Sequence, residues 1–256
     1  MTTAQDIFNF LKTEGEPFVF AAKTKPSKIE VSKLRMPSNS EAESLVFTSR
    51  DDVHPITRPA VWVRPMPSTP PTISKEFSSE ILSSTPKAVW VKIVWKFFRD
   101  KVVQCAMLPT KNLGAKIHPS AEIGSAGLGV VRDAKGKMLD VPHVGHVILH
   151  AGVRIGANSV IHRGVLSDTV IGPESRIGAM VNIGHGVIIG KDCLIAPMTT
   201  IGGSTTIGDG VTLWQGVKIA NKIHIGSKAV VAMGSVVLRN IPSGETWGGV
   251  PARKIR

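Results

Sequence analysis

The feature that most constrains the fold of this chain is a six-residue spacing of aliphatic residues in its second half. From Ile171 to Val237, every sixth residue is Ile, Leu or Val, and Gly follows at seven of these twelve positions. A period of six is neither the 3.6 of a helix nor the two of a simple strand. It predicts a mainly β fold, a parallel hexapeptide β-helix. Each short strand turns one aliphatic side chain inward, and three hexapeptides close a coil that stacks about 4.8 Å from the next.

Two interruptions of the repeat predict loops that leave the prism. Ten residues separate Ile161 from Ile171, so the stretch RGVLSDT should bulge from a corner. Between Ile123 and Leu149 the sequence is rich in Gly and charge and contains the turn signal DAKGK, which predicts an inserted loop at about 125–145. Such loops on rigid scaffolds commonly build functional sites.

The repeat also divides the chain. Residues 1–113 lack it, and their patterns predict helices at about 3–13 and near 87–103 together with strands at FVFAA, SLVFTS and AVWVRP. This part is expected to be a small α/β domain. The β-helix is assigned to 114–240, and residues 241–256 form a C-terminal tail.

The amino-acid composition limits the cellular compartment and the classes of partner that can be expected. The two cysteines, Cys105 and Cys193, are too few for a disulfide framework and are expected to be reduced. The first residues lack a basic start, and no apolar run reaches the roughly 18 residues of a membrane span, so a cytoplasmic protein is expected. A net charge of +12 suits an anionic partner. Without Tyr or clustered Lys/Arg runs, nucleic acid is a poor candidate.

His185 is the candidate catalytic residue. It follows the inward Ile183 by two places, so its side chain should point away from the prism axis. Gly203 and Asn221 occupy the same column in the next two coils. A neutral imidazole suits a general base, and the Gly203 N–H could meet a developing oxyanion. The spacing alone equally allows His185 to be a polar residue at a corner.

The same segments resemble a known family. Over residues 115–226, the runs GSAGLGVVRDAKGKMLDVPHVGHVIL, VRIGANSVIHRGVLSDTVIG, VNIGHGVIIGKDCLIA and TTIGGSTTIGDG are similar to the UDP-3-O-acylglucosamine N-acyltransferases of lipid A synthesis. The resemblance implies a left-handed β-helix, a homotrimer with active sites between subunits, and His185 and Gly203 as catalytic base and oxyanion-hole residue. It also implies nucleotide-sugar binding by the N-terminal domain, where ESLVFTS places Phe47 near an aromatic residue that stacks on uracil. The family has a Tyr beside that aromatic residue, and this chain, which contains no Tyr, has no counterpart to it.

The tail carries a second resemblance. IPSGETWGGVPARKIR is similar to the ending of acetyl-CoA-dependent sugar acetyltransferases, which lies along coenzyme A. This resemblance implies an acyl-donor site, with Arg253 and Lys254 as phosphate partners; the alternative is a solvated basic end. Where the N-acyltransferase family has a second active-site histidine, this chain has Lys222. The residues expected to bind the cofactor are Asn221, Lys222, Trp247, Gly249, Pro251, Ala252, Arg253 and Lys254.

Three further histidines follow the inserted loop as H-x2-H-x3-H, at His143, His146 and His150. A metal site is conceivable, as in hexapeptide-repeat carbonic anhydrases, but the H-x4-H pair of those enzymes is missing. Substrate contact is favoured and no metal is expected. The residues expected to bind substrate are Phe47, His143, His146, His162 and Asn182.

These patterns and resemblances predict an acyltransferase for surface polysaccharide or lipopolysaccharide synthesis. It would move an acyl group, with acetyl favoured, from a thioester to the amine of a nucleotide-linked amino sugar. Acetyl-CoA is the favoured donor and acyl carrier protein the second. The open alternatives are a lipid A-type N-acyltransferase that uses acyl carrier protein, a sugar O-acetyltransferase, a metal-dependent carbonic-anhydrase-like enzyme and a scaffold without activity.

Overall fold

The chain forms two compact units in this computed structural model, which describes residues 2–14, 18–22, 30–31, 33–35, 44–47, 61–65, 79–83, 86–98 and 110–255. The N-terminal unit comprises residues 1–100 and 128–142, and the coil unit comprises residues 101–127 and 143–256. Part of the inserted loop therefore belongs to the N-terminal unit, although it interrupts the coils in sequence.

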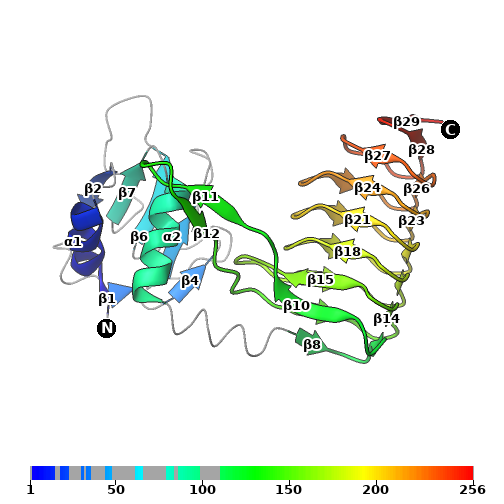
Figure 1. Cartoon of the computed structure of the whole chain (residues 1–256), viewed down its shortest axis with the longest axis horizontal. Coiled ribbons are helices and arrows are strands. Elements are labelled where there is room, and N and C mark those ends of the chain that lie inside the picture. Colours follow the sequence, from blue (N-terminus) through cyan, green and yellow to red (C-terminus); the bar gives the residue numbers. More distant parts are fainter. Residues whose placement is uncertain are drawn as a thin grey trace. The chain divides into compact units, whose positions relative to one another are not determined.

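The described residues of the N-terminal unit include a five-stranded sheet and two helices (Figure 1). In sheet order the strands are β2 (Phe18–Ala22), β7 (Ser79–Ser83), β6 (Val61–Pro65), β5 (Ser44–Phe47) and β4 (Lys33–Arg35). β2 is antiparallel to β7 and the other pairs are parallel. β1 (Thr2–Thr3) pairs with β3 (Glu30–Val31) outside this sheet. The strands at FVFAA, SLVFTS and AVWVRP are confirmed, and β1, β3, β4 and β7 had no counterpart in the prediction.

Helix α1 (Ala4–Glu14) matches its prediction, whereas α2 (Pro86–Phe97) ends six residues before the predicted 103. No Gly or Pro occurs between residues 87 and 108, so the sequence carries no stop signal there. Helix α1 buries one face, at Ile7 and Leu11, whereas α2 is buried all round its first turns, at residues 88–91, and at Ile93 and Val94. Among the described residues, no helix is long and apolar enough to cross a membrane.

The coil unit is a three-sided stack of parallel strands, as the repeat predicted (Figure 1). One face contains β10 (Glu122–Ala126), β15 (Val160–Arg163), β18 (Asn182–Ile183), β21 (Thr200–Ile201), β24 (Lys218–Ile219) and β27 (Val236–Val237). The second contains β8 (Thr110–Asn112), β13 (Val147–Leu149), β16 (Thr169–Ile171), β19 (Ile188–Ile189), β22 (Thr206–Ile207) and β25 (His224–Ile225). The third contains β9 (Lys116–Ile117), β14 (Arg154–Ile155), β17 (Arg176–Ile177), β20 (Leu194–Ile195), β23 (Thr212–Leu213), β26 (Val230–Val231), β28 (Thr246–Gly249) and β29 (Ala252–Lys254).

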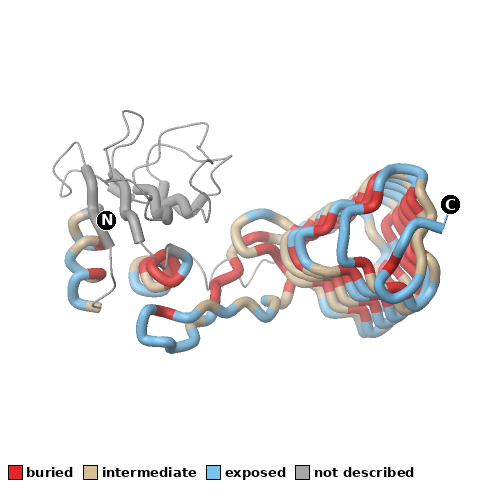
Figure 2. The backbone as a smooth tube through the Cα atoms, turned by 90° about the horizontal axis from the view of Figure 1, so that it is seen from above, coloured by how far each residue is buried: buried red, intermediate tan, exposed pale blue. Residues whose placement is uncertain are grey.

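The hexapeptide aliphatic residues form the core of the coils (Figure 2). All twelve from Ile171 to Val237 are at most 4% exposed. The residues two places earlier form a second buried row, whose polar members bond to the backbone. Ser175 Oγ donates to the Gly190 carbonyl at 2.9 Å, and Thr205 Oγ1 donates to the Ala220 carbonyl at 3.1 Å. These bonds explain how hydroxyl side chains occur inside an aliphatic prism.

The inserted loop forms the antiparallel hairpin β11 (Val130–Arg132) and β12 (Met138–Asp140). Its DAKGK turn is closed by Asp133, whose Oδ1 accepts hydrogen bonds from the backbone N–H groups of Lys135 and Lys137 at 3.0 and 2.9 Å. The indole N–H of Trp95 in α2 donates to the Asp140 carbonyl at 2.8 Å. This bond joins the hairpin to the N-terminal unit.

Candidate active site

The site begins with two segments that hydrogen bonds hold together. The N–H groups of Val144 and Gly145 donate to the carbonyls of Val165 and Gly164, at 2.8 and 3.1 Å. A Cβ at either glycine would collide with the Ser167 carbonyl, so the close approach requires glycine at both positions. The segment that follows the inserted loop is thereby fixed against the RGVLSDT bulge.

Two side chains of the bulge extend this network toward His185. Asp168 Oδ1 accepts the backbone N–H of His146 at 2.7 Å and lies 3.2 Å from His146 Nδ1. Thr169 Oγ1 donates to the His162 carbonyl at 2.7 Å and accepts the N–H of Gly186 at 2.8 Å. The bulge therefore anchors the residue that follows His185. Sequence reasoning did not single out Asp168 or Thr169, although both lie in the stretch that breaks the repeat.

The His185 ring contacts a second histidine on one side and a glycine of the next coil on another. Its centroid lies 5.5 Å from that of His143, with the ring planes at 77°. His143 is only 3% exposed, whereas His185 is half-buried. A Cβ at Gly203 would lie 2.7 Å from His185 Nε2, so any side chain there would force the ring to move. The imidazole thus has a defined position beside bare backbone.

The amide expected to form the oxyanion hole already has a partner. The Gly203 N–H donates to Asn221 Oδ1 at 2.9 Å, one coil further on. Backbone hydrogen bonds also connect these neighbouring coils. The Ser204 N–H donates to the His185 carbonyl at 2.8 Å, and the Lys222 N–H donates to the Gly203 carbonyl at 2.9 Å. The structure therefore brings His185, Gly203 and Asn221 together, and it places the Asn221 amide where a substrate oxygen was expected.

The residues expected to bind substrate lie in different surroundings. The rings of His143 and His162 both lie close to Gly127, and His162 Nδ1 is 3.3 Å from Ser125 Oγ. His146 is turned to Asp168 instead. Asn182 is half-buried in β18. Phe47 ends β5, and its side chain lies outside the described part of the chain, as does Cys105.

The tail is a hairpin added to the third face of the coils. Trp247 pairs with Val231 on one side and with Lys254 on the other. The Trp247 indole N–H donates to Glu245 Oε2, and Lys254 Nζ donates to Glu245 Oε1, both at 2.7 Å. The hydrogen bonds from Lys254 and then from Trp247 lower the pKa of Glu245. Lys254, expected to meet a cofactor phosphate, is therefore paired with a carboxylate.

Gly249, Pro251, Ala252 and Arg253, also expected at the acyl donor, belong to this hairpin, whereas Lys222 directly follows Asn221 in the coils. The Gly249 N–H donates to Ser235 Oγ at 3.2 Å, and Arg253 Nη1 donates to the Ala252 carbonyl at 3.0 Å. Ala252 is buried and packs on the coil core, whereas Pro251 and Lys222 are exposed.

The histidines of the H-x2-H-x3-H pattern do not converge on one point. His143 contacts His185, His146 contacts Asp168, and the backbone N–H of His150 donates to Ile171. Within the described ranges, no group of three or more His, Cys, Asp or Glu side chains is placed to hold a metal ion.

These stacked coils with a corner histidine place the chain in the class of hexapeptide-repeat β-helices. Residues 168–203 match the family model described as bacterial transferase hexapeptide (six repeats). UDP-N-acetylglucosamine O-acyltransferase (LpxA) from Moraxella catarrhalis RH4 has the same fold, with a TM-score of 0.51 and 20% identity over 57% of this chain and 55% of that chain.

Particular relatives share more of the sequence. The chain is 44% identical over 154 residues to UDP-3-O-acylglucosamine N-acyltransferase of Rhizobium meliloti (strain 1021). The aligned residues cover 60% of this chain and 43% of the relative. It is 53% identical over 154 residues to the protein of the same name from Sinorhizobium medicae (strain WSM419), with the same two coverages. The chain thus spans less than half the length of these curated relatives. The resemblance of the coil region is confirmed.

Proposed function

We propose that this chain is an N-acyltransferase that moves an acyl group from a thioester to the amine of a nucleotide-linked amino sugar. The observation that carries this proposal is the His185 imidazole, held against buried His143 and beside the bare backbone of Gly203. The relatives named for N-acyl transfer to an acylglucosamine nucleotide support the same reaction class. The acceptor belongs to the chemistry of surface polysaccharide or lipopolysaccharide synthesis.

In the proposed step, His185 takes a proton from the amine as its nitrogen attacks the thioester carbonyl. A C–N bond forms and the carbonyl oxygen becomes an oxyanion. Collapse of this tetrahedral intermediate breaks the C–S bond, and the imidazolium returns the proton to the leaving thiolate. The Gly203 N–H stabilises the oxyanion once the Asn221 amide, its partner in the structure, swings aside.

Acetyl-CoA is the favoured donor because of the tail, and an acyl carrier protein is the second choice. Since Lys254 is paired with Glu245, Arg253 and Lys222 bind the phosphates of coenzyme A in this proposal.

We also propose a homotrimer with active sites between subunits. Exposed apolar side chains on the coils suit burial against another copy, among them Ile188, Leu194, Met198 and Trp214. Light scattering coupled to gel filtration tests the trimer, and a stable monomer contradicts it.

Thiol release from acetyl-CoA and from acyl carrier protein thioesters, measured with UDP-, GDP- and dTDP-linked amino sugars, tests the reaction. His185→Ala should lower kcat by about 10²- to 10⁴-fold, the usual contribution of a general base. The matched control is His118→Ala, since His118 is an exposed histidine of the same unit whose side chain hydrogen-bonds to Ser120. A His185→Ala protein as active as the parent, or no thiol release with any acceptor, would contradict the proposal.

A further inference from the structure

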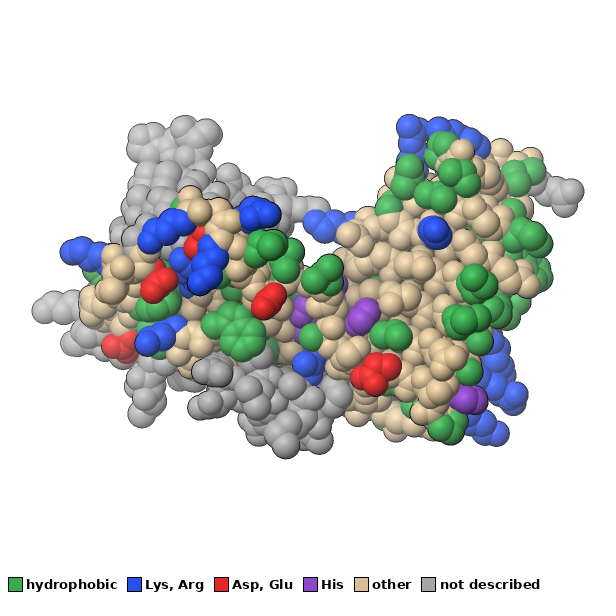
Figure 3. Space-filling view, in the orientation of Figure 1, with side chains coloured by type: hydrophobic (Ala, Val, Ile, Leu, Met, Phe, Trp, Pro, Cys, Tyr) green, Lys and Arg blue, Asp and Glu red, His purple; other side chains and the backbone are tan. Residues whose placement is uncertain are grey.

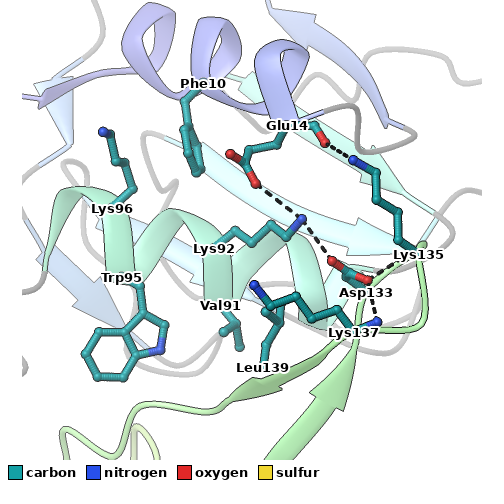
Figure 4. Close-up of a pocket in the computed structure, with 10 residues that line it drawn as sticks. All are labelled: Phe10, Glu14, Val91, Lys92, Trp95, Lys96, Asp133, Lys135, Lys137 and Leu139. Carbon is teal, nitrogen blue, oxygen red and sulfur yellow. Dashed lines mark hydrogen bonds and ion pairs between the residues drawn. The ribbon is translucent and has the colours of Figure 1, made fainter.

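The N-terminal unit contains a pocket that the proposed acyl transfer does not use. It lies between α1, α2 and the hairpin of β11 and β12, and its volume is about 450 Å³ (Figure 4). This volume is in the range of small-molecule sites. Four lysines, two acidic residues and four apolar or aromatic residues line it. Figure 3 shows basic side chains gathered around acidic and apolar ones on this unit.

One wall of the pocket is an ionic network centred on the largely buried Lys92. The Lys92 ammonium lies 3.2 Å from Asp133 Oδ2 and 3.4 Å from Glu14 Oε2, and the Lys92 side chain is only 10% exposed. Burial opposes ionisation of Asp133, but hydrogen bonds from the Lys137 and Lys135 backbone and from Lys92 lower its pKa. The lowered pKa keeps Asp133 ionised, and both carboxylates are already paired with Lys92. The network joins α1, α2 and the hairpin into a fixed frame.

The other three lysines give the pocket an excess of positive charge. Lys96 Nζ lies 5.9 Å from the centre of the Phe10 ring, and Lys135 Nζ donates to the Glu14 carbonyl at 3.4 Å. Figure 4 shows the Lys137 side chain reaching from the hairpin toward α2. Within the described residues, the structure pairs none of these three ammonium groups with a carboxylate. Four lysines against two acidic residues leave the lining with a formal net charge of +2, which favours an anion.

The rest of the lining is apolar and held in place. Trp95 is 37% exposed, yet its indole N–H is fixed on the Asp140 carbonyl at 2.8 Å. Phe10 packs edge-on against Phe97, with ring centres 5.5 Å apart. Leu139 contributes an aliphatic surface from the hairpin. A partly exposed aromatic ring in a fixed orientation offers a stacking surface at little entropic cost.

We propose that this pocket binds a small phosphate monoester that carries an apolar or aromatic group. The phosphate meets Lys135 and Lys137 of the hairpin, and the apolar group rests on Trp95 and Leu139. Lys96, which Figure 4 shows beside Phe10 at the opposite end of the pocket, adds positive charge there. A phosphate monoester carries close to two negative charges at neutral pH, whereas a carboxylate carries one, so the two ammonium groups of the hairpin favour the phosphate. The pocket is formed within the N-terminal unit alone, so this site does not depend on the proposed chemistry of His185.

Calorimetric titration of the full chain with phenyl phosphate, inorganic phosphate and benzoate tests the proposal. Phenyl phosphate should bind at least about 10-fold more tightly than the other two, because only it uses both the charged and the apolar lining. Equal affinity for inorganic phosphate would show general attraction to a basic protein and overturn the proposal. Tighter binding of benzoate would overturn the choice of phosphate.

A pair of variants separates this pocket from the general positive charge of the chain. Lys135→Met with Lys137→Met keeps the aliphatic stems and removes two charges, and should weaken phenyl phosphate binding about 10-fold. The matched control, Lys191→Met with Lys218→Met, removes two exposed lysines of the coil unit and should change affinity less than about 2-fold. Equal losses in both variants would overturn the proposal.

A measurement on the unaltered protein covers the case in which the double variant fails to fold. Saturating phenyl phosphate should slow chemical acetylation of Lys135 and Lys137, read by mass spectrometry, and leave Lys191 and Lys218 unchanged. Equal protection at all four lysines, or protection at none, would overturn the proposal.

Discussion

Gly203→Ala is the sharpest test of the geometry around His185. The new Cβ would lie 2.7 Å from Nε2, 2.9 Å from Cε1 and 3.0 Å from Cδ2 of the imidazole, and these are its three nearest neighbours. Ordinary contact begins at about 3.5 Å, so the ring must retreat by about 0.8 Å. The backbone of Gly203 is not in the left-handed region, so alanine itself is not strained there.

The expected result is a large loss of activity with a small loss of stability. A displacement of about 1 Å at a reacting group can lower the rate about 10²-fold, so kcat should fall by that order. Because the half-buried His185 ring can move, the free energy of unfolding should fall by only about 1 kcal/mol, the lower end of the range for overpacking. Thiol release, urea denaturation and the His185 ring signals in NMR measure the three effects.

Gly127→Ala is the matched control, because it adds the same methyl group beside two other histidines of the region, His143 and His162, and not beside His185. Its Cβ would lie 3.5 Å from His143 Nε2 and 3.6 Å from the His162 ring, in ordinary contact. This variant should keep the parental rate and ring signals. Parental activity in a folded Gly203→Ala protein, or an equal loss in Gly127→Ala, would refute the assignment of His185 as a precisely placed base.

Three further outcomes are expected. Asn221→Asp should lower kcat more than 10-fold, because a carboxylate would hold the Gly203 N–H and repel an oxyanion. Asn221→Ala should lower kcat less than about 3-fold. Equal kcat values in the two variants would contradict the role of Gly203 in the oxyanion hole. Since the pKa of Glu245 is lowered from 4.5, its pairing with Lys254 stabilises the fold above that pH. The stability difference between the parent and Glu245→Gln, from urea denaturation, should shrink as the pH falls below 4.5. In a Cys105→Ser background, buried Cys193, whose pKa burial raises, should react with thiol reagents only on unfolding.

The coils could be predicted because their rule is local. Each hexapeptide places one aliphatic residue inward regardless of what the distant chain does, so counting from Ile171 in steps of six identified the buried row. The break between Ile161 and Ile171 located the bulge for the same reason. The column of His185, Gly203 and Asn221 also followed from counting, since 18 residues separate stacked positions.

Side-chain partners across the column and the tail could not be predicted in this way. Counting predicted that the Gly203 amide lies beside the imidazole. It did not predict that the Asn221 side chain accepts a hydrogen bond from the Gly203 N–H. Likewise, the basic tail gave no sign that Glu245 would pair with Lys254. Such pairs depend on rotamers and on distances after folding, and several alternatives have similar energies in an open chain.

The sequence by itself determined the parallel β-helix, its register and the corner that His185 occupies. The reason is that an aliphatic residue at every sixth position points inward in each strand only when three hexapeptides form one coil. Only the tertiary structure decided that His143 packs on His185, that the hairpin of β11 and β12 joins the N-terminal unit, and that a lysine-rich pocket forms there. These features bring together residues up to about 120 positions apart, such as Glu14 and Lys135. Their contacts arise from packing of separate elements, which no local spacing encodes.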